Sequence, residues 1–221
     1  MYQRDYILRL IEQMAGMIGT VAGLRKQMKQ GQALELVDEL LGRFYRLNSK
    51  LLDTLSDKDI LAMLSVNGFV ETEKVLMLTK LMQEEGELRD SMERTDEGYR
   101  RYLKALQLAL AVSPEADGDS VDLCRERIAE LTDKLKPYRL PAEVKSGLFV
   151  HFAKEGQYAK AEDQLFELLE TDKEPVARER LLQEGIRFYR NLLNKDDAEL
   201  EQGGLPRNEV KESLAQLLEK Q

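Results

Sequence analysis

The sequence predicts an all-α protein built from antiparallel helical hairpins, an α-solenoid of about ten helices. Apolar residues recur every three to four positions through most of the chain, and no convincing stretch shows the strict alternation of a half-buried strand. The 14 glycines and five prolines stand between these segments as punctuation. A composition with 43% hydrophobic and 33% charged residues fits amphipathic helices around a core and excludes a wholly disordered chain.

The first predicted helix, over residues 2–28, has an apolar stripe and a line of small residues. Ala15, Gly19 and Gly23 follow one another at four-residue spacing, and each interior glycine costs about 1 kcal/mol relative to alanine. Close approach of another helix would offset this cost. That helix belongs either to the same chain or to a second copy in a homodimer. The apolar stripe consists of Tyr6, Ile7, Leu10, Ile11, Met14, Ile18, Val21 and Leu24.

Glycines, prolines and capping residues set the predicted limits of the next elements. Gly31 is expected to break the chain, and Ser56 with Asp59 forms a capping box at a helix start. Gly86 is expected to mark a turn or kink, and residues 113–120 form a loop. The full set of predicted helices is 2–28, 32–53, 57–66, 69–84, 87–112, 121–136, 142–154, 157–171, 175–193 and 206–219.

The predicted loop over residues 113–120 suggests that the chain divides there into two parts. We expect an N-terminal helical half over residues 1–112 and a C-terminal helical half over residues 119–221, or else one continuous domain. In the second half, Pro141 suits the first position of a helix, a brief turn is expected near residue 197, and Gly203-Gly204 with Pro206 separates the last two helices.

Net charge argues against some partners. The chain carries −8 at neutral pH, and an acidic protein repels nucleic-acid phosphates and anionic membranes, so neither is expected as a partner. Residues 1–50 nevertheless carry eight basic and five acidic side chains, which leaves −11 for the rest. Solvated helix faces account for this unevenness, and packing of the two halves on each other or on a second copy is the alternative.

Cysteine and histidine content limits the possible sites. A single cysteine and a single histidine exclude an intramolecular disulfide and a cluster of Cys or His metal ligands. The uncharged run over residues 13–24 is too short to span a bilayer, and charged side chains interrupt the apolar core that an export signal would need. We therefore expect a cytoplasmic protein.

No residue pattern predicts catalysis. His151 is expected to be a partly buried helix residue, and Cys124 to be a buried, inert thiol on an apolar face. The acidic segment over residues 115–122 lacks the glycine and glutamate spacing of a calcium loop, and the acidic run over residues 84–87 is expected at the surface. We predict no catalytic residues, no metal site and no cofactor, and hence a protein that is not an enzyme.

Residues 142–175 resemble one tetratricopeptide repeat, a helical hairpin with a period of about 34 residues. Gly156 stands at the turn, Tyr158 opens the second helix, Ala161 takes the small position, Leu165 follows as the bulky residue and Pro175 comes after the end. The resemblance implies that small residues let the two helices touch and that larger ones fill the layer between hairpins. The helix over residues 98–114 resembles the second helix of another repeat, with Tyr99, Leu106, Ala109 and Pro114 at the matching positions.

The chain also resembles, at residues 5–14 and 200–210, a family of uncharacterised helical proteins from Gram-positive bacteria. This likeness implies no particular activity.

The expected function is a non-enzymatic, cytoplasmic scaffold that binds a protein or peptide partner. If the repeat lines a groove, Glu143, Ser146 and Val150 of its first helix face the partner, and the loop residues Gly203, Gly204 and Arg207 form a further contact. A homodimer through the first helix is a further possibility. The alternative is a sensory or regulatory domain that binds a peptide or small molecule in an internal pocket, which some of the eight methionines would line.

Overall fold

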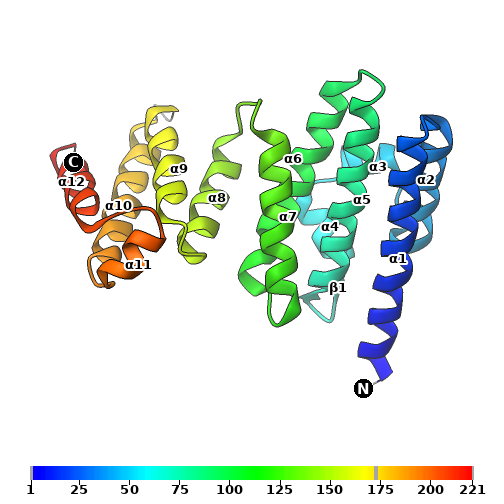
Figure 1. Cartoon of the computed structure of the whole chain (residues 1–221), viewed down its shortest axis with the longest axis horizontal. Coiled ribbons are helices and arrows are strands. Elements are labelled where there is room, and N and C mark those ends of the chain that lie inside the picture. Colours follow the sequence, from blue (N-terminus) through cyan, green and yellow to red (C-terminus); the bar gives the residue numbers. More distant parts are fainter. Residues whose placement is uncertain (1, 172–173, 221) are drawn as a thin grey trace. The chain divides into compact units, whose positions relative to one another are not determined.

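The computed structural model describes residues 2–171 and 174–220, which pack as two compact units, Met1–Arg139 and Leu140–Gln221. The described residues contain twelve α-helices, a single turn of 3₁₀-helix and one hairpin of two short strands (Figure 1). The predicted all-α class is confirmed.

The first unit is organised around helix α5. It contacts α1, α2, α6 and α7, and Figure 1 shows α5, α6 and α7 running alongside one another in the green part of the chain. The helices of this unit are α1 (Tyr2–Lys26), α2 (Gln30–Tyr45), α3 (Ser49–Thr54), α4 (Asp57–Met63), α5 (Thr72–Asp90), α6 (Thr95–Val112) and α7 (Asp119–Leu135), with the 3₁₀ turn η1 (Ser113–Glu115) before α7.

The closest helix packing in this unit lies between α5 and α6. Gly86 does not form the predicted turn; it lies inside α5, where a Cβ atom would come within 2.4 Å of Cε1 of Tyr102. At Gly98 of α6, a Cβ atom would lie 3.0 Å from the carbonyl oxygen of Gly86. The hydroxyl of Tyr102 donates to Asp90 at 2.7 Å, so the ring is fixed across this contact. Glycine at residue 86 therefore serves close packing.

The glycines of α1 behave differently. A Cβ atom added at Gly19 or Gly23, or at the neighbouring Gly16, would meet no atom within 4 Å, and Ala15 is exposed, so among the described residues no other helix packs closely against this line. The expectation of intramolecular close packing is wrong here. Of the predicted apolar stripe, Met14, Ile18 and Val21 are buried and Leu24 is half-buried, while the side chains of Tyr6, Ile7, Leu10 and Ile11 lie outside the described residues.

The predicted helix over residues 32–53 is two helices. The chain breaks before α2 at Met28, which has a left-handed φ of 59°, and Gly31 lies inside α2. Arg46, with φ of 56°, ends α2, and the side chain of Asn48 accepts from the Leu51 amide to begin α3. Left-handed non-glycine residues give little sequence signal, which explains the missed break.

The capping box at α4 is confirmed, since the Ser56 hydroxyl and the Asp59 carboxylate each bind the other's backbone amide. The helix ends at Met63, earlier than predicted. Strands β1 (Ser65–Val66) and β2 (Phe69–Val70) follow and pair through a tight turn at Asn67-Gly68, where both residues have positive φ. The Asn-Gly dipeptide is typical of such turns, but the strands are too short to show alternation.

The second unit follows the predicted limits closely. It contains α8 (Ala142–Lys154), α9 (Tyr158–Thr171), α10 (Pro175–Leu192), α11 (Asp197–Gln202) and α12 (Arg207–Glu219). Helix α8 packs on α9, and α10 packs on both α9 and α12. The short helix α11, which replaces the expected turn, is capped by the Asp196 side chain accepting from the Glu199 amide at 2.7 Å.

Candidate functional site

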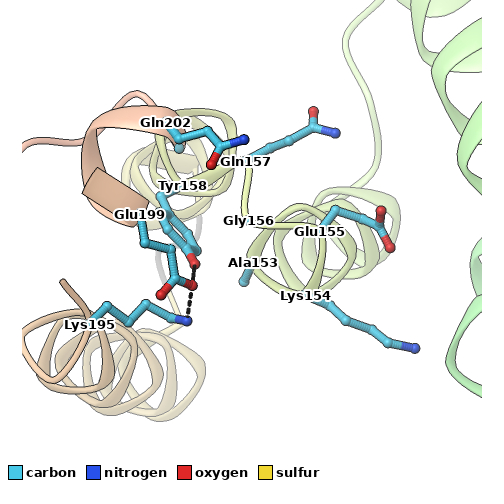
Figure 2. A pocket seen from close by; sticks show the side chains of 10 residues that line it. Ala153, Lys154, Glu155, Gly156, Gln157, Tyr158, Lys195, Glu199 and Gln202 are labelled. Atoms are coloured by element: carbon cyan, nitrogen blue, oxygen red, sulfur yellow. Dashed lines mark hydrogen bonds and ion pairs between the residues drawn. The ribbon is translucent and has the colours of Figure 1, made fainter. Parts of the chain in front are cut away.

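A polar pocket of about 500 Å³ opens in the second unit. It lies between the α8–α9 turn, the start of α9 and the segment that runs from the end of α10 into α11 (Figure 2). Its lining includes Ala153, Gly156, Gln157, Tyr158, Lys195, Glu199, Gln202 and Gly203.

Glycine at two positions lets the chain form this pocket. Gly156 adopts a φ of 72°, which allows the tight α8–α9 turn. At Gly203 a Cβ atom would lie 2.2 Å from the ring of Tyr158 and 2.6 Å from the Gly156 carbonyl oxygen. The Ala159 amide donates to the Gly203 carbonyl at 3.0 Å. The end of α11 is thus fixed against the start of α9, which sets the position of one wall.

That wall carries a cluster of three polar side chains. The hydroxyl of Tyr158 donates to Oε1 of Glu199 at 2.8 Å, and the ammonium of Lys195 donates to the same oxygen. The Lys195 nitrogen also lies 5.6 Å from the centre of the Tyr158 ring, within the range of a cation–π contact. Figure 2 shows the three side chains together, with the dashed lines joining Glu199 to its two donors.

Each group of this cluster stabilises the protonation state of the other two. Burial raises the pKa of the Tyr158 hydroxyl, and its hydrogen bond to Glu199 raises it further. The hydrogen bond from Lys195, then that from Tyr158, lowers the pKa of Glu199. The hydrogen bonds with Glu199 and Tyr158 raise the pKa of Lys195. Near neutral pH the cluster therefore holds a neutral phenol, a carboxylate and an ammonium.

The opposite wall is formed by small residues. Ala153 and Gly156 face the cluster, whereas the side chains of Lys154 and Glu155 are directed away from it (Figure 2). Gln157, in the α8–α9 turn, and Gln202, the last residue of α11, also line the pocket and carry amide groups that can both donate and accept. The small residues Ala153 and Gly156 thus lie on one side of the pocket, and the hydrogen-bonded cluster of Tyr158, Glu199 and Lys195 lies on the other.

The predicted residues of α8 form an exposed face beside this pocket. Glu143 and Val150 are exposed, the latter to 55%, and Ser146 is half-buried. Their spacing of three and four residues places them on one side of the helix, and Ala153 continues the same row. The structure therefore brings the last position of this row into the pocket but not Glu143, Ser146 or Val150.

The predicted loop residues have three different roles. Gly203 lines the pocket, and Gly204, with φ of 75°, lies close to the Ala159 side chain. The guanidinium of Arg207 donates to the carbonyls of Leu193 and Lys195 and pairs with Asp197. Since these groups occupy it, Arg207 supports the α10–α11 connection and is not placed to receive an anion.

Sequence reasoning missed the Tyr158–Glu199–Lys195 cluster. Lys195 and Glu199 stand four residues apart around a helix start, a spacing that was available as a signal. Tyr158 lies in a different hairpin, 37 residues before Lys195, and nothing in the local pattern connects them.

The acidic run in α5 was assigned wrongly to the surface. Glu84 is 6% exposed and Glu85 is fully buried. Glu84 pairs with Arg25 at 3.1 Å, and Glu85 pairs with Arg89 at 2.7 Å and Arg101 at 3.0 Å. By contrast, the expected burial of Cys124 is confirmed, and His151, with 5% exposure, is more deeply buried than expected.

Across residues 2–171 and 174–220, no three Cys, His, Asp or Glu side chains gather in a group that could hold a metal ion. Within the same ranges, every helix is either too short or too polar to cross a lipid bilayer.

Comparison with known proteins gives a family but no characterised relative. No curated protein and no solved structure matches the chain. A family model does match, over all of residues 1–221, and its description is "Family of unknown function (DUF6483)". Since the match covers the full length of this two-unit helical chain, the protein belongs to that family.

Proposed function

We propose that the protein is a non-enzymatic, cytoplasmic interaction module whose second unit binds an extended peptide segment of a protein partner. The observation that carries this proposal is the fixed cluster of Tyr158, Glu199 and Lys195, which faces a wall of small residues across an open pocket of about 500 Å³. Such a pocket suits a polar side chain or a chain terminus that needs both donors and acceptors.

The charge states of the cluster favour recognition over acid–base catalysis. An efficient general acid or base has a pKa near the working pH. Here the pKa of Tyr158 and that of Lys195 are raised from values already above neutrality, and the pKa of Glu199 is lowered. Each of the three pKa values is shifted away from neutral pH. The cluster therefore keeps the same donors and acceptors around that pH, as a binding site requires.

The α8–α9 hairpin provides further support. Its likeness to a tetratricopeptide repeat rests on Gly156 in the turn and on Ala161 and Leu165, which are fully buried between helices. Proteins built from such hairpins bind peptides along exposed helix faces. We infer that a partner segment lies along the exposed row of α8, over Val150, and places one group in the pocket beside Ala153.

A regulatory domain that binds a small molecule is the second candidate. The volume of the pocket falls within the range of ligand sites, about 300 to 1,000 Å³. No methionine lines it, so a methionine-rich cavity is not the basis of this candidate.

A homodimer through α1 is compatible with either function. The open face over Gly16, Gly19 and Gly23 would allow two α1 helices to approach closely. In an antiparallel pair centred on Gly19, the exposed Glu12 of one copy meets the exposed Lys26 of the other, because each lies seven residues from the centre. Light scattering during size-exclusion chromatography measures the mass and tests this proposal.

A pair of alanine substitutions tests the pocket. Ala153→Arg places a long side chain in the pocket from its small wall, and Ala215→Arg makes the same chemical change on the exposed surface of α12. Each full-length variant is used to capture partners from native extract after cross-linking, and circular dichroism checks that helix content is unchanged. We expect proteins that the wild type and Ala215→Arg recover to be lost with Ala153→Arg.

Equal recovery by both variants would contradict the proposal. Native mass spectrometry of the purified protein distinguishes the second candidate. A small molecule that is retained by Ala215→Arg but lost from Ala153→Arg would favour the regulatory domain over the peptide-binding module.

A further inference from the structure

We propose that an arginine cluster in the first unit binds the phosphate group of a small molecule. The cluster surrounds a second pocket, of about 190 Å³, which is separate from the site described above. Its lining consists of Asp53 from α3, Arg89 from α5, and Glu97, Arg100 and Arg101 from α6.

Two of these arginines are held in place by a buried carboxylate. Glu85 is fully buried, and its Oε1 accepts from Arg89 at 2.7 Å. Arg101, only 3% exposed, approaches Oε2 of the same carboxylate at 3.0 Å through Nε. A further nitrogen of Arg101 donates to the Ser49 carbonyl at 3.0 Å. One carboxylate thus fixes two guanidiniums and leaves one positive charge in excess beneath the pocket.

On the solvent side, two partly exposed carboxylates balance these arginines. Asp53 lies 3.2 Å from Arg101, and its side chain is 56% exposed. Glu97 pairs with Arg89 and is shared with Arg94, whose Nε lies 3.0 Å from it. In each pair the arginine is mostly buried and the carboxylate faces solvent: Arg101 is 3% and Arg89 14% exposed, against 56% for Asp53 and 37% for Glu97. An incoming anion can therefore take the place of a carboxylate that turns out into water, while the two arginines stay in position.

Arg100 adds a third guanidinium to the pocket lining. It is exposed, and no carboxylate among the described side chains lies within ion-pair distance of it. With Arg94, four guanidiniums surround a region that contains three carboxylates, Asp53, Glu85 and Glu97. The region is therefore locally positive within a chain of net charge −8.

The geometry selects among anions. A guanidinium presents its donors as a planar fork that matches an oxyanion, and phosphate offers three or more oxygens to several forks at once. A carboxylate offers only two and leaves one fork unpaired. A pocket of about 190 Å³ accepts a phosphate group with a short stem, while larger parts of a ligand must remain outside.

Calorimetric titration of the full-length protein at low ionic strength tests this site. Inorganic phosphate and glycerol phosphate are the two probes, and acetate is the carboxylate control. We expect saturable binding of at least one phosphate probe and much weaker binding of acetate. The tighter of the two phosphate probes shows whether the site prefers a free ion or a phosphomonoester.

Three variants locate the binding. Arg100→Gln should weaken phosphate binding about tenfold, since it removes one charge-assisted contact. Arg187→Gln removes an exposed positive charge from α10 in the second unit and should leave the affinity unchanged. Asp53→Asn removes a competing carboxylate and should tighten binding.

Absence of saturable phosphate binding by the wild type would overturn the inference. So would equal losses in Arg100→Gln and Arg187→Gln, which would indicate general electrostatic attraction, or equal affinities for acetate and phosphate. These outcomes concern the first unit and do not bear on the pocket around Tyr158.

Discussion

Replacing Gly86 with alanine should destabilise the protein, although alanine is the better helix former. A Cβ atom at residue 86 would lie 2.4, 2.8 and 2.9 Å from three carbons of the Tyr102 ring, where ordinary contacts exceed 3.4 Å. The ring must therefore move by about 1 Å in an interior that is packed as densely as an organic crystal. Tyr102 is 1% exposed and is tied to Asp90 by its hydroxyl, so it has little room to do so.

The expected magnitude follows from three contributions. Overpacking of a core costs about 1–3 kcal/mol. Loss of the hydrogen bond from Tyr102 to the charged Asp90 costs about 1.5–3 kcal/mol. The gain in helix propensity offsets about 1 kcal/mol. We expect a net loss of about 1.5–5 kcal/mol in the free energy of unfolding.

Gly42→Ala is the matched control. Gly42 is exposed near the end of α2, and the nearest atom to an added Cβ, the Leu47 carbonyl oxygen, is 3.9 Å away. The same substitution should therefore stabilise the protein, by up to about 1 kcal/mol. Urea unfolding followed by circular dichroism measures both variants, and hydrogen exchange of α5 and α6 amides assigns the effect to the first unit.

The decisive result is a change in the free energy of unfolding that has opposite signs in Gly86→Ala and Gly42→Ala. If Gly86→Ala raised the unfolding midpoint as Gly42→Ala does, the close packing against Tyr102 would not hold in solution. In a Tyr102→Phe background, Gly86→Ala should cost less than in the wild type, because the hydrogen bond to Asp90 is already absent. Strict additivity would show that Gly86→Ala leaves the hydrogen bond from Tyr102 to Asp90 intact.

Two further predictions concern the ion pairs of α5. Burial alone would raise the pKa of Glu87, but the hydrogen bond from Lys134 and the charge of Arg25 outweigh it and lower that pKa below its ordinary value of 4.5. The unfolded state therefore binds a proton more readily, so the unfolding free energy should fall as pH drops below about 4.5, and urea midpoints of Glu87→Gln should fall less steeply. Arg101→Met leaves buried Glu85 with Arg89 as its remaining ion-pair partner and should cost about 3–5 kcal/mol in thermal or urea unfolding. Recovery of stability in the double variant Arg101→Met/Glu85→Gln would confirm that the loss of one of the two arginine partners of Glu85 is the cause, and no recovery would refute it.

The candidate site could be predicted only in part. Gly203 was identified because paired glycines before a proline mark an unusual backbone, and Gly203 does line the pocket. The polar groups of the pocket were not identified, because Tyr158 and Glu199 come from separate hairpins and meet only through tertiary packing. Arg207 illustrates the opposite error. Its position after Gly203-Gly204 suggested an anion contact, but neighbouring carbonyls occupy it.

The amino-acid sequence by itself determined the all-α class and most helix limits, because apolar periodicity, prolines and capping residues act within a few positions of one another. The helices α8, α9 and α10 and the capping box of α4 follow from such local signals. Tertiary structure decided which glycines serve close packing, which acids are buried and which side chains share a pocket. A glycine is equally small in α1 and in α5, but Gly86 of α5 lies against an aromatic ring from another helix, whereas Gly16, Gly19 and Gly23 of α1 have no such neighbour within 4 Å of an added Cβ. In sequence Glu85 looks like the many exposed acids of the chain, but tertiary packing buries it completely, where Arg89 and Arg101 reach it from two helices.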